Sequence, residues 1–327
     1  MHMSDALLSP AVAGVMYAAS GTAVAASALK LRRCGEPVKV AEVGVMGAFV
    51  FAAQMINFAI PGTGSSGHLC GGMLLAAVLG PCLGFLTFAV VLLVQCLLFA
   101  DGGILAFGAN LWNMAFYGSL LGGGVILPLV ERGSPSRAKV FAVCIVGSVL
   151  AFQLGAFSVA LQTLASDVTE LPFRTFVAAM QTVHLAIGAV EGAITAAILC
   201  FLLEMRPEML ALRTRCSSAK FSRLTVLSVF AASAFVIGGL LSLVASSSPD
   251  GLEWSVERAA EGKLECSGAM HLKAAEIQEK VALLPDYAFP DSDAAGGNVL
   301  SGLLGTGATL LLCAVGAYIV RKRKRSA

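Results

Sequence analysis

The stretch C-L-G-F-L-T-F-A-V-V-L-L-V-Q-C-L-L-F-A at residues 82–100 has no charged side chain and is long enough to cross a bilayer as a helix. Only 13% of the 327 residues are charged, whereas a soluble domain has about 25%. The sequence therefore predicts an all-α integral membrane protein. Its apolar segments fall at about residues 10–29, 40–60, 69–80, 82–100, 111–130, 138–160, 173–203, 224–245 and 299–320.

The basic residues predict how these segments thread the membrane. Of the 22 lysines and arginines, 17 lie in four stretches, residues 30–39, 132–139, 206–223 and 321–325. Nine crossings place all four stretches on one side, which the positive-inside rule makes the cytoplasmic side. We therefore expect the N-terminus outside and the C-terminus inside, with the short segment 69–80 counted as a crossing.

The charges also suggest a division of the chain. Residues 1–215 are expected to form a compact seven-span unit, and residues 216–327 a two-span unit around a polar insert at about 246–298. That insert carries 10 of the 20 acidic residues. An acidic outer loop could gather cations. It could equally be a solvated, weakly ordered loop.

The first three residues, Met1-His2-Met3, form a potential metal chelator. The terminal amine, the amide nitrogen of His2 and its imidazole can form two fused rings around one ion, which leaves one in-plane position open. Square-planar nitrogen coordination favours Ni(II) or Cu(II), and Co(II) can adapt to it. No signal peptide is predicted, so Met1 should keep a free amine. The alternative is that His2 belongs to a frayed terminus.

His68 could supply the fourth nitrogen, because it closes the Gly/Ser-rich stretch 61–68 on the same predicted side as His2. A loop histidine can equally be a plain surface residue. Polar residues near the outer helix ends could orient the imidazoles from behind, or could simply cap helices. These residues are Gln54, Asn57, Gln95, Asp101, Asn110 and Asn113.

His184 and Glu191 lie seven residues apart in one apolar segment and so share a helix face. Ionisable residues inside a membrane suggest function, although hydrogen bonding within the bundle would also explain them. Other motifs are missing from the sequence. Without G-x-x-x-x-G-K-[ST] the chain is not expected to hydrolyse ATP, and without H-E-x-x-H an intramembrane metalloprotease is disfavoured. No basic patch with interleaved aromatic residues points to nucleic acid.

Several motifs resemble one known family. Met1-His2, F-V-F-A-A-Q-M-I-N-F at 49–58, G-H-L at 67–69 and the segment from His184 to Glu191 look like the CbiM/NikM family over about residues 1–210. Members are substrate-binding S components of energy-coupling factor (ECF) transporters for nickel or cobalt. The resemblance implies a seven-helix S-component fold. It also implies that the Met1 amine, the backbone and ring of His2, and His68 bind the metal.

Pro249-Asp250-Gly251-Leu252-Glu253 is similar to the PDGLE-type NikN component, which makes nickel our first choice and cobalt, for cobalamin synthesis, our second. The resemblance implies a multi-pass protein of a prokaryotic plasma (inner) membrane, with no enzymatic activity and no permanent cofactor. Its expected partners are a NikQ/CbiQ-like T component, NikO/CbiO-like ATPases and membrane lipid. The rival interpretations are a membrane metal sensor, a non-transporting metal-binding subunit, or a metalloenzyme, which would need an open coordination position.

Overall fold

The computed structural model confirms a helical membrane protein. It describes residues 1–33, 38–131, 136–211, 220–260, 268–289 and 296–325. Parts of the basic stretches 30–39, 132–139 and 206–223, and of the insert 246–298, lie outside the described residues.

Six helices among the described residues are long and apolar enough to cross a membrane. Side chains on α6 and α7 such as Leu150, Phe157 and Leu185 are apolar and exposed, as expected of a surface that faces lipid rather than water. The six are α1 (Pro10–Arg33), α4 (Pro81–Leu98), α6 (Arg137–Ser166), α7 (Phe173–Met205), α11 (Gly296–Arg325) and one continuous helix made of α5 (Phe107–Asn110), π-helical η2 (Leu111–Ile126) and η3 (Leu127–Glu131).

The segment expected as a crossing at 69–80 differs from an ordinary spanning helix. Its helix, α3 (Gly72–Leu79), has 8 residues and is about 12 Å long. Gly71 and Gly80 bound it with φ values of 78° and 83°, which glycine adopts without strain. The segment still reaches far into the bundle. His68 lies beside Met1, whereas the Ala77 carbonyl accepts a hydrogen bond from Ala211, beyond the end of α7.

Two shorter apolar helices, α2 (Val40–Gln54) and α8 (Arg223–Gly239), complete the bundle together with α11. Helices α8 and α11 pack against α2 and against each other. Their backbones touch, because a Cβ added at Gly302 would lie 1.8 Å from the Gly238 carbonyl oxygen. The C-terminal part is therefore packed onto the N-terminal part and is not a separate appendage. A short turn, η4 (Pro207–Met209), follows α7.

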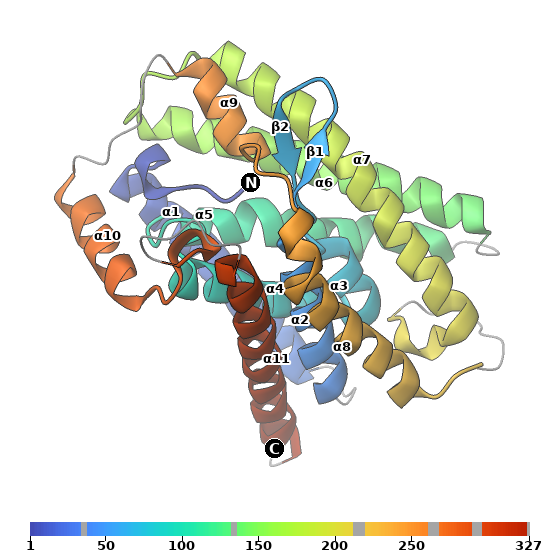
Figure 1. The fold of residues 1–327 in the computed structure, drawn as a ribbon. Coiled ribbons are helices and arrows are strands. Elements are labelled where there is room, and N and C mark those ends of the chain that lie inside the picture. Colours follow the sequence, from blue (N-terminus) through green and yellow to red (C-terminus); the bar gives the residue numbers. More distant parts are fainter. Residues whose placement is uncertain (34–37, 132–135, 212–219, 261–267, 290–295, 326–327) are drawn as a thin grey trace.

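The described part of the polar insert is folded rather than a solvated loop. The insert follows η5 (Leu241–Val244) and contains α9 (Gly251–Ala259), α10 (Ala269–Val281) and η6 (Pro285–Tyr287). Figure 1 shows α9 and α10 lying over one end of the bundle. Trp254 of α9 donates to the Thr63 carbonyl, and His271 of α10 contacts the Leu8 carbonyl at 2.8 Å. The insert thus covers the N-terminal segment.

The N-terminus lies in the middle of the fold, beneath α9 and beside a small hairpin (Figure 1). The hairpin pairs β1 (Phe58–Ile60) with antiparallel β2 (Ser65–Gly67), with Ile60 opposite Ser65. Residues 1–9, including η1 (Asp5–Leu7), enter the bundle and leave Met1 only 4% exposed. The alternative of a frayed terminus therefore does not hold in the structure.

Candidate metal centre

The terminal amine of Met1 sits between two side chains from distant parts of the chain. It is 3.2 Å from Nε2 of His68, which follows β2, and 2.6 Å from a carboxylate oxygen of Asp250, which precedes α9. Burial opposes the charge on the amine, but the Asp250 carboxylate outweighs this effect and raises the pKa of the amine. The terminus is thus fixed beside His68 by an ion pair.

The tautomer of His68 follows from its backbone neighbour. Its Nδ1 lies 3.0 Å from the Leu69 carbonyl, which can only accept a hydrogen bond. Nδ1 therefore carries the proton, and Nε2 presents a lone pair to the Met1 amine. Burial lowers the pKa of His68 to about 4, so the imidazole is neutral at neutral pH. The residue before His68 is packed tightly. A Cβ at Gly67 would lie 2.5 Å from the side chain of Ile187, so a larger residue there would push against Ile187.

The ring of His2 stacks on that of His68, with centroids 5.2 Å apart and planes inclined by 16°. Its Nδ1 lies 3.1 Å from a carboxylate oxygen of Asp101, and its Nε2 lies 3.2 Å from Oε1 of Gln95. Burial, assisted by the neighbouring terminal amine, lowers the pKa of His2 to about 3. Two neutral imidazoles and the terminal amine therefore lie together in one buried place.

A chain of glutamines sets the tautomer of His2. The Cys70 carbonyl can only accept, so Gln54 must turn its amide nitrogen toward it, at 2.7 Å. Gln54 then offers its oxygen to the amide nitrogen of Gln95, at 2.6 Å, which turns the Gln95 oxygen toward His2. Nε2 of His2 therefore donates, and Nδ1 keeps a lone pair. Nδ1 is the nitrogen that can close a ring with the amide of the same residue.

Asp101 faces that lone pair from the loop after α4. Tyr287 of η6 donates a hydrogen bond of 2.6 Å to its other oxygen. Burial raises the pKa of the Asp101 carboxyl group above its usual range. Tyr287 comes from the C-terminal part of the chain, so both parts contribute to the surroundings of His2.

Met3 holds the terminus in register. Its N–H donates to Oδ1 of Asn110 at 2.6 Å, and its carbonyl accepts from Nδ2 of Asn110 at 3.0 Å and from the N–H of Gly103 at 2.9 Å. Asn113 lies next to the Met3 sulfur at 3.4 Å and exchanges two hydrogen bonds with Gln162. The side chain of Asn110 thus forms hydrogen bonds with both the N–H and the carbonyl of Met3, the residue that follows His2.

Replacing Asn110 with alanine is expected to weaken the binding of a divalent transition-metal ion at the terminus by about ten- to a hundredfold, as loss of groups that orient ligands typically does. Both backbone groups of Met3 would lose a buried partner, and the terminus would gain freedom. Calorimetric titration of the purified variant measures the change. Asn57→Ala is the matched control, because Asn57 accepts the N–H of Ser246 with its backbone carbonyl, and alanine keeps that hydrogen bond. Equal losses in both variants would contradict the prediction.

The polar residues expected behind the imidazoles therefore contact different parts of the N-terminal segment. Gln54 and Gln95 connect to His2, Asn110 and Asn113 to Met3, and Asp101 directly to the His2 ring. The side chain of Asn57 lines a cavity in front of the histidines.

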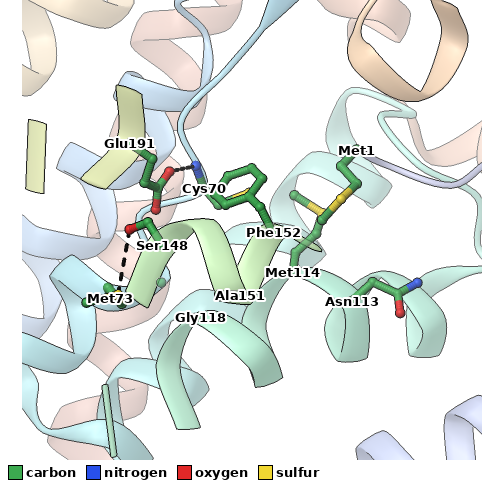
Figure 2. A pocket seen from close by; sticks show the side chains of 11 residues that line it. Met1, Cys70, Met73, Asn113, Met114, Gly118, Ser148, Ala151, Phe152 and Glu191 are labelled. Carbon is green, nitrogen blue, oxygen red and sulfur yellow. Dashed lines mark hydrogen bonds between the residues drawn. The ribbon is translucent and has the colours of Figure 1, made fainter. Parts of the chain in front are cut away.

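His184 and Glu191, expected to share one helix face, make separate contacts. The Glu191 carboxylate accepts a hydrogen bond of 2.5 Å from the N–H of Cys70 (Figure 2). It also accepts one of 2.9 Å from the N–H of Gly71, just before α3. His184 is fully buried, and its Nδ1 donates to the Met180 carbonyl at 2.7 Å. Its Nε2 has no hydrogen-bond partner among the described residues. Glu191 therefore stabilises the turn that follows His68.

Beneath the terminus the fold is nearly solid. Figure 2 shows the Met1 side chain above Met114, in a space also lined by Cys70, Phe152 and Glu191. The free volume there is about 10 Å³, enough for one water at most. The Met1 side chain thus fills the space between the terminal amine and the interior of the bundle.

In front of the terminus lies a larger, polar cavity of about 340 Å³. Its walls come from both parts of the chain, and they include His2, His68, Asp101, Asp250 and Glu253. The rings of His2 and His68 therefore border this cavity. In the part of the chain that the structure describes, no three His, Cys, Asp or Glu side chains are grouped to hold a metal.

Asp250 and Tyr287 were not expected at the centre from the sequence. The PDGLE motif marked the region of Asp250, but its contact with Met1 joins residues 249 positions apart.

Both parts of the chain match known proteins. The family described as cobalt uptake substrate-specific transmembrane region, CbiM, matches residues 2–209, and the PDGLE domain matches residues 224–322. The chain is 33% identical to a putative fused nickel transport protein NikMN of Archaeoglobus fulgidus, over 98% of both chains. It is also 33% identical to the fused nickel transport protein NikMN of Rhodobacter capsulatus, over 97% of this chain and 96% of that one.

A solved structure is also similar. The crystal structure of a truncated transition metal transporter is 30% identical in sequence and superposes with a TM-score of 0.54. The match covers 62% of this chain and 99% of that one.

Proposed function

Because the chain belongs to the CbiM family of cobalt uptake substrate-specific transmembrane proteins and carries a PDGLE domain, we propose that it is the S component of an ECF importer for Ni(II). As a member of this family it is a multi-pass membrane protein of nickel or cobalt transport. The importer type, the preferred ion and the ligands are the proposal.

The observation that carries the proposal is the set of nitrogen groups around Met1. Nε2 of His68 and Nδ1 of His2 each carry the lone pair of their ring, because the other ring nitrogen donates a hydrogen bond, and both rings lie beside the terminal amine. With the amide nitrogen of His2 they make a four-nitrogen ligand set. The ion is the substrate, and the amine must leave Asp250 and lose its proton to bind it.

Nickel is the preferred substrate on two grounds. A planar set of four nitrogens suits Ni(II), which accepts square-planar geometry. The full-length relatives that share both domains are described as nickel transport proteins. Co(II) uptake for cobalamin synthesis is the alternative, since the family itself is described by cobalt uptake.

The proposal includes an orientation and partners. The polar cavity is lined by residues of the acidic insert and by Asn57 and His68, which flank the hairpin, and the positive-inside rule favours this end as the outer one. A NikQ/CbiQ-like T component and NikO/CbiO-like ATPases would supply the ATP hydrolysis for which this sequence has no P-loop. The chain itself would bind the ion and release it without enzymatic chemistry.

The test is a titration of the purified chain, with native Met1 and no N-terminal tag, with Ni(II) and Co(II). Elemental analysis gives the stoichiometry, and visible absorption reports the coordination geometry. We expect one Ni(II) per chain with a square-planar spectrum. Preferred binding of Co(II) would move the function to cobalt supply, and binding of neither ion would overturn the proposal.

Transport is tested separately. Cells that produce the chain together with the T and ATPase components should accumulate Ni(II), and cells without the ATPases should not. A chain that binds Ni(II) tightly but supports no uptake in the complete set would instead be a sensor or a non-transporting subunit.

A further inference from the structure

The PDGLE motif meets the proposed metal centre through a single charged contact. One carboxylate oxygen of Asp250, Oδ2, lies 2.6 Å from the Met1 amine. The side chains of Met1 and Asp250 are 3% and 16% exposed, so the contact is largely shielded from water. An ion pair in such a place is far less screened than one on the surface.

The rest of the motif fixes Asp250 in this position. Its other oxygen, Oδ1, accepts the N–H groups of Leu252 and Glu253, both at 2.8 Å, and the Glu253 carboxylate accepts the N–H of Asp250 at 3.1 Å. This is a complete capping box at the start of α9. One oxygen of Asp250 thus anchors the helix, and the other is left for the terminus.

The other residues of the motif pack α9 against the N-terminal part of the chain. The Pro249 carbonyl accepts the N–H of Ser66 in β2 at 2.8 Å, two residues before His68. Leu252 is 2% exposed. A Cβ at Gly251 would lie 2.8 Å from the side chain of Val183 and 3.1 Å from the ring of His184, so a larger residue would push these side chains of α7 away.

The charge of the bound ion requires a partner. The ligand set contains two neutral imidazoles and an amine, and the His2 amide contributes at most one negative charge to a divalent ion. A net positive charge in a buried site is costly unless it is compensated. Asp250 already contacts one ligand and carries the opposite sign. It remains beside the centre when the amine turns to the ion.

We propose that the PDGLE motif exists to place the Asp250 carboxylate at the metal centre, where it positions the Met1 amine before the ion arrives and balances the charge of the ion once bound. This inference rests on the proposed function, and it assigns Asp250 as a positioning residue that acts through Met1. The C-terminal domain then completes the site and is more than a tether for partners.

Asp250→Asn separates this role from helix capping. Asparagine caps helices about as well as aspartate, so the variant keeps α9 and removes only the charge. We expect Ni(II) affinity to fall by about tenfold or more, within the range for groups that support metal ligands. The spectrum at saturating Ni(II) should match that of the wild type, because the four nitrogens remain. A damaged fold would change that spectrum.

One matched variant serves as the control. Glu257→Gln removes one exposed carboxylate from the same helix, and it has no part in the capping box. It should bind Ni(II) within about threefold of the wild type. Asp250→Asn binding as tightly as this control would overturn the inference alone. A wild-type chain that binds neither Ni(II) nor Co(II) would overturn the proposed function and the inference with it.

Discussion

Replacing His2 with alanine is expected to lower Ni(II) affinity by at least about a hundredfold, or ~2.8 kcal/mol. The imidazole closes the second chelate ring, and without it the ion keeps only the amine, one amide and His68. His68 would also lose its stacking partner, because the centroids of the His2 and His68 rings lie 5.2 Å apart in the wild type. Calorimetric titration measures the affinity, and visible absorption should lose the square-planar band.

The matched control is His271→Ala. His271 is also buried, but its ring contacts the Leu8 carbonyl and does not line the cavity in front of Met1. This variant should bind Ni(II) nearly as the wild type does. Unchanged affinity in His2→Ala, or an equal loss in His271→Ala, would exclude the ligand set proposed here.

The membrane fold could be predicted because each spanning segment carries its own signal. The charge-free stretch at 82–100 forms α4 with only small shifts at its ends. The segment 69–80 gave a weaker signal, since its length leaves the backbone conformation open. In the structure Cys70 bonds through its N–H to Glu191 and through its carbonyl to Gln54, so these groups are unavailable to a helix. Those partners lie on other segments, and no local pattern reveals them.

The candidate site divides in the same way. Met1, His2 and His68 could be proposed from the sequence because a terminal amine followed by histidine, and a second imidazole, are nitrogen donors that can bind metal ions. Which polar residue supports which ligand could not be selected, because each contact joins distant positions, as with Met3 and Asn110. Asp250 was hidden for another reason. In the sequence it is one of ten acids in the insert, and only the packing of α9 singles it out.

A Gly/Ser extension of six residues before Met1 is expected to remove Ni(II) binding almost completely, with a loss of affinity of about a thousandfold, or ~4 kcal/mol. The extension turns the terminal amine into an amide, which loses both its charge and its role as the first donor of the chelate. It also has no room at its present position, because the Met1 nitrogen lies between His68 and Asp250 in a residue only 4% exposed. The ion pair with Asp250 would be lost with the charge.

The extension can carry its own control. A protease site placed directly before Met1 allows the six residues to be removed from the same purified sample, which regenerates the free amine. Titration before and after cleavage should show no binding and then binding of one Ni(II) per chain. Because the His2 and His68 side chains are present throughout, recovery isolates the amine as a ligand. Equal binding before and after cleavage would mean that the ion is held without the terminus, and the burial of Met1 would then need another explanation.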